Sequence, residues 1–186
     1  MTSDAHLGIQ AAVSDVLPHA SWQRCRTHFA KNLSSMVPKT QWPTLSAMFH
    51  TIFQQPDAEA VWTQAREVVE FCQAKFPHVA DYLEEHLDDV LAFTHTPKSV
   101  WTKVWSNNPT ERLNREIRRR TDVVGIFPHR DAVIRLVGAV LAEQHDEWIQ
   151  QKRYMSLTSL EQTKALITAN VLDADTTTPA GKEIAA

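Results

Sequence analysis

The helical character of the chain shows in DAEAVWTQAREVVEFCQAKFPHVADYLEEHLDDVLA, a stretch that spans residues 57–92. It holds two helical patterns, which Pro77 separates because proline cannot continue a helix from its interior. The second pattern is apolar on one side, at Leu83, Leu87 and Val90, and its acids lie on another face, at positions 81, 84, 85 and 88. We expect helices at 57–75 and 79–92, the second with a solvated acidic face. The alternative is a contact of these acids with the arginines of 112–120.

The same helical reading extends to both sides of this stretch. The 186-residue chain has only 4 glycines, too few for the many tight turns of an all-β domain, so the expected fold class is mainly α. Further helices are expected at 26–36, at 40–54, after Pro97, from Pro109 to about Arg120, and from about His129 to Arg153. A connection is expected at 122–127 and a short buried strand at 21–25.

The two ends of the chain carry further patterns. Near the start, Ser3 or Asp4 can cap a helix that ends before Pro18. The last long helix is apolar along one side, so we expect it to be packed along much of its length. The apolar residues are Val133, Val137, Val140, Leu141 and Trp148. From about Asn170 the apolar periodicity is lost, which predicts a frayed tail.

Charge and composition limit the possible partners. A net charge of −3 argues against a protein that coats nucleic acid generally, so any contact with phosphate needs a local basic patch, and 112–120 is that patch. The chain opens without a basic-then-apolar leader, and no apolar run is long enough to cross a bilayer. Cys25 and Cys72 are far apart in sequence and suit a reducing compartment. We therefore expect a cytoplasmic protein with no membrane contact.

The basic patch belongs to NNPTERLNREIRRRT, residues 107–121. Asn108 can cap this helix, and Glu111 could reach back to the Asn108 backbone N–H in a capping box. On a helical wheel one face carries a carboxylate, an amide and two guanidiniums, which suit a phosphodiester with a divalent cation. This face consists of Glu111, Asn114, Arg115 and Arg118. The alternative is a solvated face with Glu–Arg pairs.

Two further pairs of side chains are candidates for chemistry. Cys25 and His28 could share a helix face and bind zinc, but structural zinc needs four ligands and no second pair is present. We expect Cys25 to be a small core residue and His28 a satisfied hydrogen-bonding residue near the site. Trp101 and Trp105 are expected in the core, and stacking on a displaced base is their alternative role.

Several of these stretches together resemble successive motifs of the mutator-type transposases of bacterial insertion sequences. The stretches are SDAHLGIQAAV at 3–13, SWQRCRTHFAKNL at 21–33, NNPTERLNREIRRRTDVVGIFP at 107–128, RLVGAVLAEQHDEW at 135–148 and KRY at 152–154. The resemblance covers essentially 3–155. It is specific because it includes the order and the wide spacing of separate motifs.

The resemblance implies an Asp-Asp-Glu transposase that cleaves and transfers DNA strands with Mg²⁺ or Mn²⁺. Its catalytic domain would be RNase H-like α/β with a helical insertion between the second Asp and the Glu. Asp4 matches the second Asp and Glu111 the Glu, so these two would be catalytic and would hold the metal. Cys25 and His28 match a Cys-x-x-His motif near the site. The DNA contacts, to transposon ends and target DNA, would come from Arg112, Asn114, Arg115, Arg118, Arg119 and Arg120.

Under the same resemblance the chain divides into four segments. These are a partial RNase H-like core at 1–39, the helical insertion at 40–100, the C-terminal catalytic helices at 101–155, and a peripheral helix with a disordered tail at 156–186. In the family the first Asp precedes the SDAH motif, where this chain has only Met-Thr-Ser. We therefore expect a truncated transposase that is inactive alone and that associates with a missing N-terminal half or a second copy. The alternatives are a non-catalytic DNA-binding or regulatory module and a helical interaction module.

Overall fold

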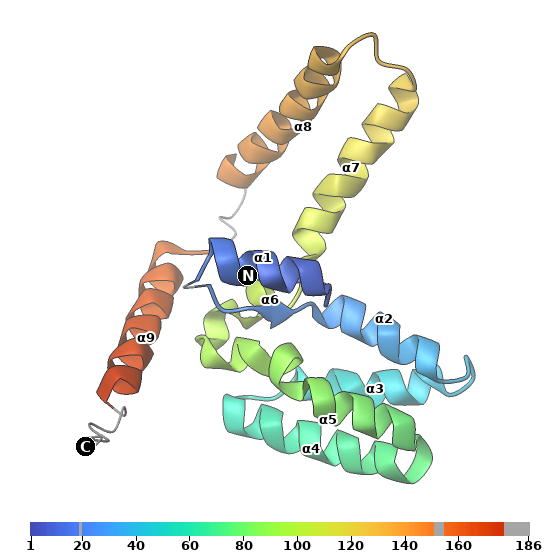
Figure 1. Ribbon diagram of the computed structural model, residues 1–186, viewed down its shortest axis with the longest axis vertical. Helices are drawn as coiled ribbons and strands as arrows, with labels where there is room; N and C mark the ends of the chain where they lie inside the picture. The colour runs from blue at the N-terminus through green and yellow to red at the C-terminus, as the bar shows by residue number, and fades with distance from the viewer. Residues whose placement is uncertain (19, 151–154, 177–186) are drawn as a thin grey trace, which may run out of the picture.

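The computed structural model describes residues 1–18, 20–150 and 155–176 and is mainly helical, as predicted (Figure 1). The first elements are β1 (Thr2–Ser3), α1 (Leu7–Val16), β2 (Gln23–Arg24) and α2 (Arg26–Met36). The next are α3 (Trp42–Ile52), α4 (Ala58–Lys75) and α5 (Pro77–Leu91). Two 3₁₀ turns, η1 (Ala92–His95) and η2 (Lys98–Val100), lead to α6 (Trp101–Val104). The last elements are α7 (Asn108–Val124), α8 (Arg130–Gln150) and α9 (Leu157–Thr176).

β1, α1 and β2 form a β–α–β unit, and its two short strands make a small parallel sheet. β1 pairs with β2 in parallel, with Thr2 opposite Gln23 and Ser3 opposite Arg24, and α1 connects the two strands. The expectation that Ser3 or Asp4 caps α1 is wrong, because Ser3 belongs to the strand. His6 is the N-cap instead, and its Nδ1 accepts a hydrogen bond of 3.1 Å from the Gly8 N–H. The predicted strand at 21–25 is confirmed in shorter form as β2.

The core lies between α2, α3, α4 and α5, which pack together below the sheet in Figure 1. Pro77 separates α4 from α5 as predicted, and these two helices pack closely against each other. Leu83, Leu87 and Val90 are buried, and the acids at 81, 84, 85 and 88 are exposed, so the predicted solvated face is confirmed. No ion pair among the described residues joins these acids to the arginines of α7.

Aromatic rings join the core to the segment that leads into α7. The ring of Phe93 is 1% exposed and lies edge-on to Trp101 and Trp105, with ring centroids 5.1 and 5.5 Å away. The Arg26 guanidinium lies over the Trp105 ring, 4.5 Å from its centroid. Trp101 is buried and Trp105 packs against the core, so the predicted core role of this pair is confirmed.

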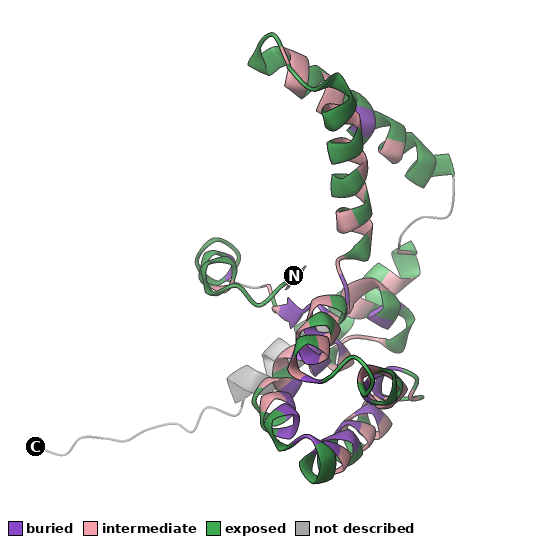
Figure 2. Cartoon of the chain, turned by 90° about the vertical axis from the view of Figure 1, so that its right-hand side faces the viewer, coloured by how far each residue is buried: buried purple, intermediate pink, exposed green. Residues whose placement is uncertain are grey.

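Helices α7 and α8 form an antiparallel hairpin that projects from the rest of the chain (Figures 1 and 2). α7 continues to Val124, beyond the expected end near Arg120, and Gly125 ends it with a φ of 72°, a left-handed conformation that favours glycine. The expectation that α8 is packed along much of its length is wrong. Val140 is its buried residue, while Trp148 is 45% exposed, because the main neighbour of α8 is α7.

The end of the chain is described only in part. α9 continues to Thr176, so the fraying predicted from about Asn170 does not begin there, and the rest of the predicted tail lies outside the described residues. The KRY stretch at 152–154 also lies outside them. Among the helices described, none combines the length and the apolar character needed to span a membrane.

Candidate active site at the start of α7

The site forms where the start of α7 meets the junction between β2 and α2. The Arg26 N–H donates to the Trp105 carbonyl at 2.8 Å, and the Thr2 hydroxyl donates to the Val104 carbonyl at 2.5 Å. These two hydrogen bonds therefore fix the segment before α7 against β1 and the start of α2.

Two asparagines continue this junction with their side chains. The Cys25 thiol donates to Asn107 Oδ1 at 3.0 Å, and the Thr27 hydroxyl donates to Asn108 Oδ1 at 3.2 Å. The prediction that Asn108 caps α7 is wrong, because the helix begins at Asn108 and Asn107 is its N-cap, without a side-chain capping bond. Both amide side chains connect α7 to the start of α2 rather than capping the helix.

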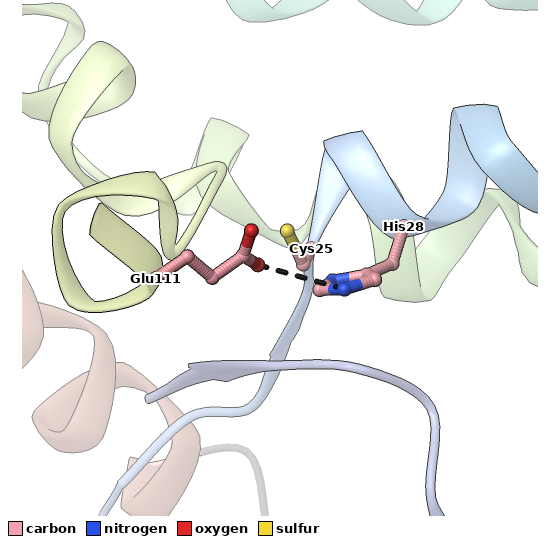
Figure 3. A group of neighbouring side chains, drawn as sticks. All are labelled: Cys25, His28 and Glu111. Atoms are coloured by element: carbon pink, nitrogen blue, oxygen red, sulfur yellow. Dashed lines mark ion pairs between the residues drawn. The ribbon is translucent and has the colours of Figure 1, made fainter. Parts of the chain in front are cut away.

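Glu111 takes part in the same junction and forms no capping box. Its Oε1 lies 3.5 Å from Nε2 of His28, a residue in the first turn of α2 (Figure 3). Both side chains are about one-third exposed, at 34% for Glu111 and 29% for His28. Glu111 Oε1 and His28 Nδ1 are buried atoms without a hydrogen-bond partner. The expectation that His28 is a satisfied hydrogen-bonding residue is therefore wrong.

Cys25 completes a group of three potential metal ligands with His28 and Glu111 (Figure 3). One ligand atom from each residue lies within 4.8 Å of the others, and Cys25 is fully buried. It is the only such group of three or more His, Cys, Asp or Glu residues in the described parts of the chain. Sequence reasoning found the Cys25–His28 pair and missed the third ligand, since no local spacing relates Glu111 to them.

Asp4 lies near this junction but outside the three-residue group. It follows β1 directly, while Cys25 follows β2, and the Cys25 N–H donates to the Ser3 carbonyl at 2.7 Å. Because the strands are parallel, Asp4 and Cys25 leave the sheet at the same edge. The Asp4 carboxylate is exposed and accepts a hydrogen bond of 2.8 Å from the Ala5 N–H. A metal site shared by Asp4 and Glu111 stays a prediction.

The side chains of the face predicted on α7 line a surface pocket. Glu111, Asn114, Arg115 and Arg118 line a pocket of about 260 Å³. Within the part of the chain that the structure describes, neither Arg115 nor Arg118 takes part in an ion pair. The pocket therefore offers two guanidiniums, an amide and a carboxylate to a ligand from outside.

The remaining arginines have other neighbours. Arg119 donates two hydrogen bonds to Glu116, at 2.8 and 2.9 Å. Arg120 donates to Glu116 at 2.8 Å and to both carboxylate oxygens of Glu143 on α8, at 2.6 and 3.1 Å. Arg112 lines a separate pocket of about 270 Å³ beside α8. The solvated face with Glu–Arg pairs thus describes Arg119 and Arg120 but not Arg115 and Arg118.

These ion pairs change the acidity of both glutamates. Hydrogen bonds from Arg119 and then Arg120 lower the pKa of Glu116 from 4.5 to about 2. The hydrogen bond from Arg120 lowers the pKa of Glu143. The ion pairs of Glu116 within α7 therefore stay ionised well into the acidic range.

Comparison with known proteins agrees with the motifs at this junction. The chain is 55% identical over 169 residues to the transposase for insertion sequence element IS1081 of Mycobacterium tuberculosis, an alignment that covers 91% of this chain and 41% of that protein. It is 32% identical over 166 residues to the transposase for insertion sequence element ISRM5 of Rhizobium meliloti, covering 89% and 42%. It is 33% identical over 153 residues to the transposase for insertion sequence element IS256 in transposon Tn4001 of Staphylococcus aureus, covering 81% and 39%.

The chain thus spans about 41% of the length of the first of these relatives. The family model described as "Transposase, Mutator family" matches residues 1–151. This range includes the two-stranded sheet, the junction between β2 and α2, and the whole α7–α8 hairpin. Since that match extends over most of the sequence, the chain belongs to the mutator family of transposases.

Proposed function

We propose that this chain is part of a transposase that binds DNA and carries out metal-dependent strand cleavage and transfer, and that α7 contacts the DNA backbone. The pocket lined by Glu111, Asn114, Arg115 and Arg118 is the observation that carries the proposal. Guanidiniums hold phosphate oxygens through paired hydrogen bonds, and the two arginines here have no ion pair among the described residues. A projecting hairpin can also reach DNA without steric hindrance from the core (Figure 2).

The charge of the chain supports a local contact with phosphate. The net charge is −3, so the long-range field of the whole chain does not favour nucleic acid. Binding then depends on the guanidiniums that have no ion pair among the described residues and can bind phosphate directly. Arg119 and Arg120 would have to exchange their hydrogen bonds to Glu116 first, which makes Arg115 and Arg118 the principal contacts.

Asp4 and Glu111 are the proposed ligands of the catalytic Mg²⁺ or Mn²⁺. Strand transfer of this kind uses two metal ions about 4 Å apart, held by carboxylates. Asp4 and Cys25 leave the sheet at the same edge, and Cys25 lies beside Glu111. This arrangement supports the pairing of Asp4 with Glu111. In the described residues, however, Glu111 is grouped with a thiol and an imidazole and with no second acid. A further carboxylate would come from another segment or another copy of a longer transposase.

The β–α–β unit supports the view that the first segment is part of an RNase H-like sheet. Its two strands are parallel, and the helices α3, α4 and α5 intervene between it and α7, as the expected insertion would. Under this proposal the exposed edge of the two-stranded sheet pairs with further strands of a complete catalytic domain.

Salt-dependent DNA binding tests the proposed contact. Fluorescence anisotropy with a labelled duplex of transposon-end sequence gives the slope of log K against log salt. Each phosphate contact contributes about 0.9 to that slope, so Arg115→Ala with Arg118→Ala should reduce it by close to two. A matched control removes two exposed positive charges elsewhere, with Lys31→Ala and Arg66→Ala, and should leave the slope unchanged. An unchanged slope in the Arg115/Arg118 variant would contradict the proposal.

A cleavage assay tests the proposed catalytic role separately. We expect the 186-residue chain by itself to bind end-labelled DNA without cutting it in Mg²⁺ or Mn²⁺, because its described residues do not gather enough carboxylates for two ions. Metal-dependent cutting that is lost in an Asp4→Ala, Glu111→Ala variant would show that the chain holds a complete site. If a longer transposase retained strand transfer after Glu111→Gln, the second candidate, a non-catalytic DNA-binding module, would be favoured.

A further inference from the structure

We propose that Cys25, His28 and Glu111 form a binding site for a thiophilic divalent cation of the Zn²⁺ type. The proposal concerns metal binding by the chain alone, and it stands whether or not α7 binds DNA. The three residues supply one sulfur, one nitrogen and one oxygen ligand, which lie within 4.8 Å of one another. Zinc sites are built from these three kinds of ligand.

The spacing of the ligand atoms suits a tetrahedral ion. Zinc bonds of about 2.0–2.3 Å place neighbouring ligands of a tetrahedron roughly 3.3–3.8 Å apart. The His28 Nε2 and Glu111 Oε1 atoms, 3.5 Å apart, already have that separation. The Cys25 sulfur lies between the same two elements, so small side-chain rotations bring it into range (Figure 3).

An independent observation points to a ligand at this place. Glu111 Oε1 and His28 Nδ1 are buried and have no hydrogen-bond partner, although buried polar atoms are usually satisfied. A cation bonded to Oε1 would satisfy the carboxylate. Coordination through Nε2 would also fix the orientation of the His28 imidazole.

The donor set selects the kind of metal. Thiolate and imidazole ligands favour Zn²⁺ and its relatives, whereas Mg²⁺ requires oxygen ligands in near-octahedral geometry. Three protein ligands leave one position of a tetrahedron for water. Cys25 must lose its proton to bind, which ends its donation to Asn107 Oδ1; the Asn107 amide can then turn its NH₂ group toward the thiolate.

Binding would have a structural effect and a functional one. The ion would join the start of α2 to the start of α7, which the Cys25–Asn107 hydrogen bond already connects across 82 residues of sequence. It would also occupy Glu111 Oε1. If the proposed function is right, Zn²⁺ at this site competes with the catalytic Mg²⁺ for the same carboxylate.

Cobalt spectroscopy of the untagged, reduced chain tests the site without DNA. Co²⁺ added to the chain should give a sulfur-to-cobalt charge-transfer band together with the intense visible bands of a tetrahedral site, and Zn²⁺ should remove both. The charge-transfer band should disappear in Cys25→Ser and persist in Cys72→Ala, which changes the other buried cysteine. A band that follows Cys72, or no band at all, would overturn the proposal.

Variants of the two partly exposed ligands, His28 and Glu111, keep the test valid if Cys25→Ser fails to fold. His28→Ala and Glu111→Gln should each weaken Zn²⁺ affinity, measured against a chromogenic chelator, by more than about tenfold. The matched controls His95→Ala and Glu67→Gln change exposed residues outside the group and should leave the affinity unchanged. Equal affinities in all four variants would mean that Zn²⁺ binds elsewhere or not at all. A chain that binds Zn²⁺ but not DNA would refute the proposed function alone.

Discussion

The imidazole of His28 and the carboxylate of Glu111 face each other across 3.5 Å, each from the first turn of its own helix. In the metal-free protein this pair is one of the side-chain contacts that hold α2 against α7.

The coupling between His28 and Glu111 can be measured directly. A double-mutant cycle with His28→Ala and Glu111→Ala, in a buffer that contains a chelator, should give a coupling free energy of about 0.2–1 kcal/mol at a pH where the imidazole is charged. The coupling is small because solvent screens a pair that is about one-third exposed. Urea unfolding curves provide the four free energies. Strictly additive effects would show that the two side chains do not interact in solution.

Two neighbouring arginines of α7 should differ in their effect on DNA affinity. Arg118 lines the pocket with Glu111, whereas Arg119 is held by Glu116 through two hydrogen bonds. Arg118→Ala should therefore weaken duplex binding several-fold more than Arg119→Ala, although both remove one charge from the same helix. Anisotropy titrations at one low salt concentration suffice, and equal losses would count against the assignment of the pocket as the phosphate site.

The ion pairs of Glu116 with Arg119 and Arg120 within α7 should tolerate acid. Because the pKa of Glu116 is lowered from 4.5 to about 2, its ion pairs contribute stability fully above about pH 4.5 and lose that contribution as the pH falls toward 2. Carbon-detected NMR of the glutamate side chains should place the Glu116 titration well below the ordinary range. In an Arg119→Ala, Arg120→Ala variant it should move back toward 4.5. A normal value in the unaltered chain would contradict these ion pairs.

The aromatic cluster under α6 should dominate stability. Phe93 is 1% exposed and contacts the rings of Phe53, Trp101 and Trp105, so Phe93→Ala should reduce the free energy of unfolding by about 3–5 kcal/mol. Phe71 is only partly buried, and Phe71→Ala should cost clearly less. Chemical denaturation of both variants checks the difference, and similar losses would mean that Phe93 is less tightly packed than its exposure indicates.

The helices with a clear apolar side could be predicted from the sequence. The alternation of Leu83, Leu87 and Val90 with acids, together with the break at Pro77, determines α4 and α5 because local periodicity and burial agree there. The same reasoning failed for α8, whose apolar residues face a single neighbouring helix and remain largely exposed. Periodicity identifies a face that can be buried, and it does not tell whether a partner covers it.

The site could be predicted only where its residues share one helix. The face of Glu111, Asn114, Arg115 and Arg118 follows from helical geometry alone, and the pocket is lined by these four residues. The contact between Glu111 and His28, and the use of Asn107 and Asn108 to hold α2, depend on tertiary structure. For Glu111 the sequence also allowed a local capping interaction, and the long-range contact with His28 prevailed because α7 begins beside α2.

The sequence separation of 82 positions between Cys25 and Asn107 also bears on the order in which the molecule assembles. Helices α4 and α5 make local contacts that form early, whereas closing so long a loop costs entropy that only the packed helices can offset. We therefore expect the junction that holds Cys25, His28 and Glu111 to form in the last stage of folding. A chain arrested before that stage would have a native-like helical core and neither binding site.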